Sequence, residues 1–335
     1  MNEIVLVIGD PLMAVEQLAA PAEALLGTRF EVRRASWQAT QPEAIAMNRR
    51  IEAGGPAAVD AVLHSDADDD RVVGIITQFF PLSREVLARW PRLRAVATMR
   101  AGTENIDRTA LADRGVAFAA NAGRNANAVA EMTVALMLAT LRDVGEGHRH
   151  VRDGGWRPEP LPLGLRELSG RCLGLVGYGA VGRLVQRRLV GFDLDVLVSD
   201  PFLDPAGLSD GRLVTLDELV ASADVVSLHA RSSPQTRGLL GATHLSAMRS
   251  DAILVNTARA DLLDESALVA ELQRGGISGA GLDVFSVEPM PADSPLRTMR
   301  GVVLSPHLAG ATVEARSRAP ELVARNLESL LLPAA

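Results

Sequence analysis

The chain has 335 residues, 47% of them hydrophobic, and a formal net charge of −7. All 34 of its basic residues are arginines, which excludes chemistry that needs a lysine, such as Schiff-base formation. An acidic chain without a basic block is not typical of a nucleic-acid-binding protein, and no apolar run is long enough to predict a membrane span. The single cysteine excludes an internal disulfide, so we expect a cytoplasmic protein.

The first 120 residues alternate short apolar runs with helical stretches. Such alternation predicts a parallel sheet covered by helices. The predicted strands are residues 4–8, 30–33, 72–77, 93–98 and 116–119.

The acidic loop between the second and third of these strands imitates the start of a calcium-binding loop. Asp66, Asp68 and Asp70 have the expected spacing, but Arg71 and Thr77 stand where glycine and glutamate are needed. We therefore expect a surface loop and no metal site.

The loop 99–107 directly follows the predicted strand 93–98. Ligands of parallel sheets bind at the carboxyl ends of the strands, so Arg100, Ala101 and Gly102 are candidates for binding an anionic substrate. The alternative is a plain turn with an exposed arginine.

Apolar residues recur at helical spacing from residue 127 to about residue 150. A helix that is apolar over much of its surface needs partners on more than one side. Together with the irregular arm 154–170 around Trp156, this helix predicts a homodimer.

Residues 171–200 have the pattern strand, glycine turn, helix, strand. Gly177 would allow the turn, Gly179 the approach of a pyrophosphate, and Gly182 the packing of the helix on its strand. Asp200 follows the second strand and would accept hydrogen bonds from ribose hydroxyls, which favours NAD over NADP. The alternative is an ordinary turn without a ligand. The candidate cofactor-binding residues of the turn are Gly177, Tyr178, Gly179, Ala180, Val181 and Gly182.

Strands and helices continue to alternate after this unit, which predicts a doubly wound parallel sheet. Thr215 and Asp264 are expected to begin helices. The last helix, residues 312–332, contains Pro320 and should be kinked or split there. The further predicted strands are residues 224–229, 252–256, 279–285 and 302–305.

Four polar stretches end predicted strands or follow them closely, at residues 256–259, 282–285, 287–289 and 305–312. Together with the glycine turn they resemble the D-isomer-specific 2-hydroxyacid dehydrogenase family, which includes the D-3-phosphoglycerate dehydrogenases. The resemblance covers roughly residues 93–312. It implies an α/β fold of two doubly wound domains, with a Rossmann NAD-binding domain (121–305) inserted in a flavodoxin-like substrate domain (1–120 and 306–335).

The resemblance also implies an NAD-dependent enzyme with the catalytic residues Arg259, Glu288 and His307. It places His229, Thr257 and Asp283 at the cofactor, Asp283 at its nicotinamide end.

The chemistry of 2-keto acid reduction agrees with these three catalytic residues. Arg259 can bind the substrate carboxylate through two parallel hydrogen bonds. His307 can give a proton in reduction and take one in oxidation. Glu288 would hold the imidazole in one tautomer and favour its cationic form.

Some positions depart from the family pattern and leave the substrate open. Ala260 and Asp261 replace the usual small residues, and Arg231 stands where a proline is common. The substrate class is a small D-2-hydroxy acid or 2-keto acid, with or without a second anionic group, of the phosphoglycerate, glyoxylate, hydroxypyruvate or sugar-acid type. The alternatives are an NAD-sensing corepressor-like protein and a phosphonate or formate oxidiser, although a formate enzyme should have glutamine in place of Glu288.

Overall fold

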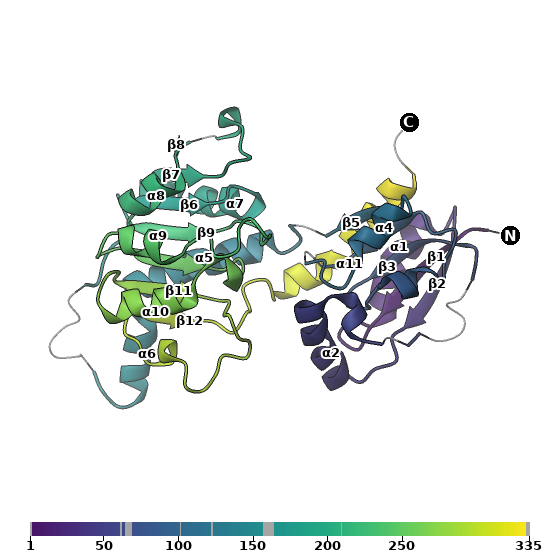
Figure 1. Ribbon diagram of the computed structural model, residues 1–335, viewed down its shortest axis with the longest axis horizontal. Helices are drawn as coiled ribbons and strands as arrows, with labels where there is room; N and C mark the ends of the chain where they lie inside the picture. The colour runs from purple at the N-terminus through teal and green to yellow at the C-terminus, as the bar shows by residue number, and fades with distance from the viewer. Residues whose placement is uncertain are drawn as a thin grey trace. The chain divides into compact units, whose positions relative to one another are not determined.

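The computed structural model describes residues 2–60, 62–63, 69–100, 102–121, 123–156, 164–208 and 210–332. The chain divides into two compact units (Figure 1). Unit 1 comprises Met1–Arg124 and Val313–Ala335, and unit 2 comprises Asn125–Thr312. The expected boundaries, after residues 120 and 305, lie a few residues before these divisions.

Unit 1 is a doubly wound α/β unit. Within its described part, five parallel strands have the order β2-β1-β3-β4-β5, the flavodoxin-like order. The strands are β1 (Ile4–Gly9), β2 (Glu31–Ser36), β3 (Val72–Thr77), β4 (Ala95–Thr98) and β5 (Ala117–Ala120). The helices are α1 (Val15–Leu26), α2 (Gln41–Gly54), α3 (Arg84–Leu87), α4 (Arg108–Asp113) and α11 (Val313–Leu331), with a 3-10 turn η1 (Pro56–Ala58).

Alternate residues of the strands in unit 1 face two separate hydrophobic clusters. Ile4 and Leu6 pack in the cluster that includes residues of α2, α3 and α4. Val5 and Val7 pack in the cluster that includes residues of α1 and α11. This period of two is the one that a sheet buried on both faces requires.

Unit 2 is also doubly wound, with the order β12-β11-β10-β9-β6-β7-β8 over the seven parallel strands that the structure describes there. Its strands are β6 (Cys172–Val176), β7 (Asp195–Ser199), β8 (Arg212–Leu213), β9 (Val225–Leu228), β10 (Ile253–Asn256), β11 (Gly279–Leu282) and β12 (Val302–Leu304). The helices are α5 (Ala126–Leu141), α6 (Val144–Arg152), α7 (Ala180–Arg188), α8 (Leu216–Ser222), α9 (Ala242–Ala247) and α10 (Glu265–Gln273). Short 3-10 turns are η3 (Val190–Phe192), η4 (Pro205–Gly207), η5 (Ala260–Leu262) and η6 (Pro295–Arg297).

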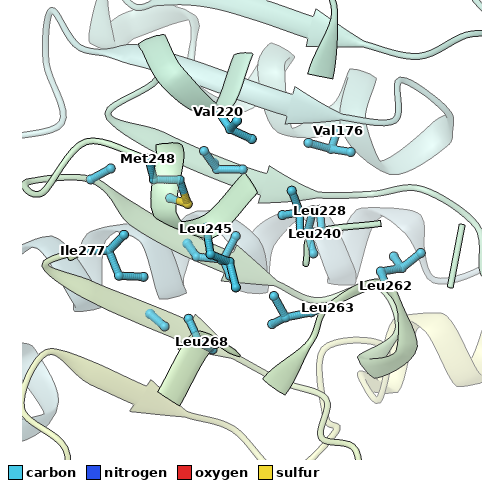
Figure 2. Packing of buried hydrophobic residues seen from close by; sticks show 14 of the residues in the cluster. Val176, Val220, Leu228, Leu240, Leu245, Met248, Leu262, Leu263, Leu268 and Ile277 are labelled. Atoms are coloured by element: carbon cyan, nitrogen blue, oxygen red, sulfur yellow. The ribbon is translucent and has the colours of Figure 1, made fainter. Parts of the chain in front are cut away.

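The two faces of this second sheet are covered by different helices. Figure 2 shows part of the cluster on the α8, α9 and α10 face, which includes Val220, Leu245 and Leu268 of these helices and Leu228 of β9. Residues of α5 and α7 pack with the sheet in the other cluster. Burial on both faces holds the sheet rigidly between two apolar layers, and its strand ends are therefore suited to presenting functional side chains.

The helix caps agree with the sequence, because Thr215 and Asp264 accept hydrogen bonds from Glu218 N and Ala267 N at the starts of α8 and α10. One other expectation is wrong, and the expected split of the last helix is absent. The long helix 127–150 is two helices, α5 and α6, separated at Asp143, whose φ of 49° is left-handed. Aspartate tolerates that conformation, which ends helical geometry. The last helix is not split, because α11 runs through Pro320.

The apolar residues of α5 have partners inside unit 2. Leu136, Met137 and Leu141 are buried in the cluster that α5 shares with α7 and the sheet. Exposed apolar side chains follow α5 instead, at Val144, Val151 and Trp156. Residues 157–163 of the expected arm lie outside the described residues. No helix in the described ranges combines the length and the apolar character that crossing a membrane requires.

Candidate active site

The candidate residues of unit 2 lie just after the carboxyl ends of its parallel strands. The strand order reverses between β6 and β9, and doubly wound sheets bind ligands at such a reversal. The candidate residues that follow a strand end within three positions are Gly177, Tyr178, Gly179, Asp200, His229, Thr257, Arg259, Asp283 and His307.

The three glycines of the turn after β6 meet three different requirements. Gly177 has a φ of +93°, and a Cβ there would lie 2.6 Å from Ala230 N. A Cβ on Gly182 would lie 2.6 Å from Gly177 O, so α7 packs closely on the turn. A Cβ on Gly179 would have no heavy atom within 4 Å. Gly179 therefore leaves open space before the first residues of α7, Ala180 and Val181, where a pyrophosphate would meet helix amides.

Asp200 is bound to the glycine turn. Its Oδ2 accepts a hydrogen bond from Tyr178 N at 2.8 Å, and its Oδ1 accepts one from Phe202 N at 3.0 Å. The side chain of Tyr178 is buried and its hydroxyl donates to Gln186. Tyr178 can therefore meet a cofactor only through its backbone, whereas Asp200 keeps lone pairs for two ribose hydroxyls.

His229 has a ring nitrogen without a partner. Its Nε2 lies 3.0 Å from Ser227 Oγ, but Nδ1 is buried and has no hydrogen-bond partner among the described residues. Burial lowers the pKa of His229 to about 4, so the ring is neutral near pH 7. The ring lies under the glycine turn, since a Cβ on Gly182 would be 3.8 Å from its Cδ2. An unsatisfied nitrogen at this place fits a polar ligand on the turn.

Thr257 has a fixed hydroxyl. Its Oγ1 lies 2.7 Å from Thr133 Oγ1, and Thr133 Oγ1 donates to Val129 O at 2.7 Å. Because a hydroxyl has one hydrogen, Thr257 must be the donor to Thr133. Its hydroxyl can therefore act toward a ligand only as an acceptor.

His307 and Glu288 form a hydrogen-bonded pair. Nδ1 of His307 lies 2.8 Å from Glu288 Oε2, and the other oxygen, Oε1, accepts from Phe285 N at 3.0 Å. A carboxylate accepts only, so the Nδ1 atom carries a proton and Nε2 is left for chemistry. Both side chains are partly exposed, at 52% for His307 and 38% for Glu288, so the pair can meet a substrate.

Asp283 holds the loop that carries His307. Its two oxygens accept from Leu308 N and Ala309 N, each at 2.9 Å, and its carbonyl accepts from His307 N at 2.9 Å. The residue is 1% exposed. His307 has a φ of 56°, a left-handed conformation that a histidine keeps only where neighbours enforce it. The bonds to Asp283 enforce it.

Arg259 is exposed at the end of β10. Its Nη1 donates to Ala258 O at 2.7 Å, and in the described part of the chain no partner binds Nε or Nη2. These two nitrogens form one edge of the guanidinium, the edge that a carboxylate can bind with two hydrogen bonds. Asn256, which the sequence did not single out, fixes the turn by donating to Arg259 O and accepting from Ala258 N. An asparagine before a tight turn is a sequence signal for this role.

The substrate-loop residues belong to unit 1. Arg100 is 14% exposed, donates to Asn48 Oδ1 at 2.9 Å and stacks 4.7 Å from the Phe79 ring centroid. Gly102 lies beside Glu104. Ala101 lies outside the described residues.

Asp261, the extra carboxylate close to Arg259 in the sequence, is engaged within unit 2. It accepts a hydrogen bond from Ser232 and lies 3.6 Å from Arg237 Nε. Asp66 and Asp68 of the acidic loop in unit 1 lie outside the described residues. Among the residues that the structure describes, no group of three or more His, Cys, Asp or Glu side chains is arranged to hold a metal ion.

Comparisons with known proteins identify the family to which the chain is related. The family model for the NAD-binding domain of D-isomer specific 2-hydroxyacid dehydrogenases matches residues 134–309. The chain is 37% identical over 279 residues to a glyoxylate reductase from Korarchaeum cryptofilum, covering 81% of this chain and 82% of that protein. It is 36% identical over 249 residues to a D-3-phosphoglycerate dehydrogenase from Mycobacterium bovis, covering 74% of this chain and 47% of that protein.

Solved structures resemble the whole chain. A glyoxylate reductase from Paecilomyes thermophila has a TM-score of 0.78 and 28% identity, covering 99% of this chain and 96% of that one. An NADPH-dependent glyoxylate/hydroxypyruvate reductase from Sinorhizobium meliloti has a TM-score of 0.76 and 28% identity, with the same coverage. The predicted fold class, two doubly wound units with a nucleotide-binding domain, is confirmed.

The geometry of Asp200 predicts a preference for NADH over NADPH. A 2′-phosphate would meet the carboxylate, and like-charge repulsion should lower kcat/KM with NADPH by at least about tenfold, which is about 1.4 kcal/mol. Asp200→Ala should narrow the difference in steady-state kinetics. Asp200→Asn is the matched control for charge alone, because it removes the negative charge but can still accept the hydrogen bond from Tyr178 N. Equal efficiency with both cofactors in the unmodified protein would contradict this prediction.

Proposed function

Because the chain belongs to the D-isomer specific 2-hydroxyacid dehydrogenase family, we propose that Arg259, Glu288 and His307 carry out its oxidoreductase chemistry on a small D-2-hydroxy acid or 2-keto acid. The observation that carries the proposal is the pair in which Glu288 binds Nδ1 of His307 and leaves Nε2 available.

Reduction of a 2-keto acid needs a hydride, a proton and a fixed carboxylate. Bound NADH supplies the hydride. The protein must supply the other two functions and must hold the keto carbon in one orientation.

Arg259 fixes the carboxylate. Its exposed Nε and Nη2 edge can donate two parallel hydrogen bonds, while the bond from Nη1 to Ala258 O holds the guanidinium in place. A carboxylate bound in this way cannot rotate, so the keto group keeps a constant direction.

His307 moves the proton. In reduction Nε2 of the imidazolium gives its proton to the forming alkoxide, and in oxidation the neutral ring takes it back. Glu288 keeps the proton at Nδ1 and stabilises the imidazolium by its opposite charge.

The roles of the cofactor-binding residues are proposed from their positions along the carboxyl edge of the sheet in unit 2. The glycine turn 177–182 would bind the pyrophosphate and Asp200 the adenosine ribose. His229 and Thr257 follow β9 and β10, so they are proposed to contact the cofactor farther along that edge. Asp283 is proposed to act at the nicotinamide end, in addition to its bonds with the loop of His307.

We also propose the cellular compartment of the enzyme and the loop that binds its substrate. We place it in the cytoplasm, because its one cysteine is free and the pKa of that thiol is raised to about 11 by burial, so the thiol is unreactive. Arg100 and Gly102 are proposed to bind substrate in the loop after β4.

The next prediction concerns the catalytic residues. His307→Ala should lower kcat by about a hundredfold or more, because a positioned proton donor is lost. Arg259→Ala should chiefly raise KM for the keto acid, and Arg259→Lys should recover little because an ammonium cannot form the fork. The measurement is steady-state NADH oxidation with a panel of 2-keto acids.

Glu288→Gln provides the matched control for charge. It keeps the shape of the side chain but removes the negative charge that faces Nδ1 of His307, so kcat should fall while KM for the keto acid changes little. An unchanged rate for His307→Ala would remove the mechanism and favour an NAD-sensing protein.

We also predict that the protein forms a homodimer. Val144, Val151 and Trp156 expose apolar side chains, 83% of Trp156 being exposed, and a second subunit would bury such a group. Light scattering at micromolar concentration should give twice the mass of the chain. Trp156→Ser should weaken the dimer, while Phe202→Ser, at an equally exposed aromatic residue, should not. A monomeric mass for the unmodified protein contradicts this prediction.

A further inference from the structure

Asn121 joins three segments of unit 1. It is buried, and its backbone N–H donates to Arg100 O at 2.9 Å and to Thr98 O. Its side-chain Nδ2 donates to Ala319 O of α11 at 3.0 Å. The loop after β4, the loop after β5 and the first turns of α11 are therefore bound to one residue.

Three arginines lie on these segments. The backbone carbonyl oxygen of Arg100 accepts the hydrogen bond from Asn121 N. Arg124 is three residues after Asn121, and Arg316 is three residues before Ala319. The pKa of Arg124 is lowered by burial and then by the positive charges of Arg100 and Arg316. The guanidinium of Arg124 therefore lies close enough to those of Arg100 and Arg316 to be repelled by both.

Arg124 has no counter-ion among the residues that the structure describes. Its Nε is buried without a hydrogen-bond partner, and among the described residues neither Arg124 nor Arg316 forms an ion pair. A guanidinium stays protonated, so an unsatisfied buried N–H on it is costly. The free energy of this arrangement falls if an anion binds there.

The carboxylates of this region are directed to Arg100. Glu104 Oε2 lies 3.6 Å from Arg100 Nη2, and Asp10 also attracts Arg100. The Asp10 carboxylate accepts from three backbone N–H groups, and burial raises its pKa to about 6. In the described part of the chain, neither acid forms an ion pair with Arg124 or Arg316.

We propose that unit 1 binds an anionic group, a phosphate or a carboxylate, at Arg124, with Arg316 and Arg100 beside it. The anion has two sources: a second acidic group on the 2-keto acid, or free inorganic phosphate. Only the first source rests on the proposed function.

The first arm of the test is phosphate binding, which needs no turnover. The full chain is titrated with inorganic phosphate in a calorimeter and in thermal unfolding, at constant ionic strength adjusted with chloride. Arg124→Gln should weaken the phosphate affinity at least about tenfold, because the central donor is lost. Without phosphate this variant should unfold at or above the temperature of the unmodified protein, since the repulsion is relieved.

The second arm compares substrates of equal length. The ratio of kcat/KM for oxaloacetate to that for 2-oxobutyrate, and for 3-phosphohydroxypyruvate to that for hydroxypyruvate, is measured in both proteins. A tenfold fall of either ratio in Arg124→Gln identifies the substrate as the source of the anion. Loss of phosphate binding with unchanged ratios identifies free phosphate.

Arg318→Gln is the matched control, because this exposed arginine lies on the same helix, α11, and its Nε donates to Glu314 O. It should change neither readout. The proposal is overturned if the unmodified protein binds no phosphate at millimolar concentration and Arg124→Gln leaves both ratios unchanged. It is also overturned if Arg318→Gln produces the same losses.

Discussion

The buried carboxylate of Asp283 is the interaction on which the reactive edge of unit 2 depends. It follows β11 directly and accepts two backbone N–H bonds from the loop after β12. These charge-assisted bonds compensate the burial of the carboxylate and hold His307 in a left-handed conformation. The imidazole can meet Glu288 only because the loop is fixed in this way. Asp283 therefore fixes the loop after β12, and Glu288 orients the imidazole ring of His307.

Much of the fold could be predicted because its signals are local. Strands 4–8 and 72–77 are short apolar runs, and the glycine turn has a fixed spacing before Asp200. The break at Asp143 was not predicted, because it depends on a left-handed backbone conformation of a residue type that also occurs inside helices. Pro320 does not split α11, because this helix packs on α1 and on the sheet, and the packing outweighs the lost helical hydrogen bond.

The sequence could indicate candidate site residues by their chemical type, but it could not indicate most of the contacts that hold them in place. The sequence indicated Arg259, Glu288 and His307 as chemical groups, and the structure gives them partners. It could not indicate that Asn256 fixes the turn of Arg259 or that Arg124 has a buried, unsatisfied Nε, because both facts depend on which backbone and side-chain atoms meet after folding. Both units place candidate side chains in loops after parallel strands: His307 follows β12 in unit 2, and Arg100 and Arg124 follow β4 and β5 in unit 1.

The central claim is that Glu288 holds the proton on Nδ1 of His307 and leaves Nε2 to exchange protons with substrate. The tautomer can be measured directly by ¹⁵N–¹H correlation spectra of the histidine rings in ¹⁵N-labelled protein, with the signals of His307 assigned by their absence in His307→Gln. The account predicts that the neutral ring of His307 carries its proton on Nδ1. A neutral ring protonated on Nε2 would contradict it, because that tautomer cannot donate to Glu288 and cannot accept a proton at the atom that faces the reaction.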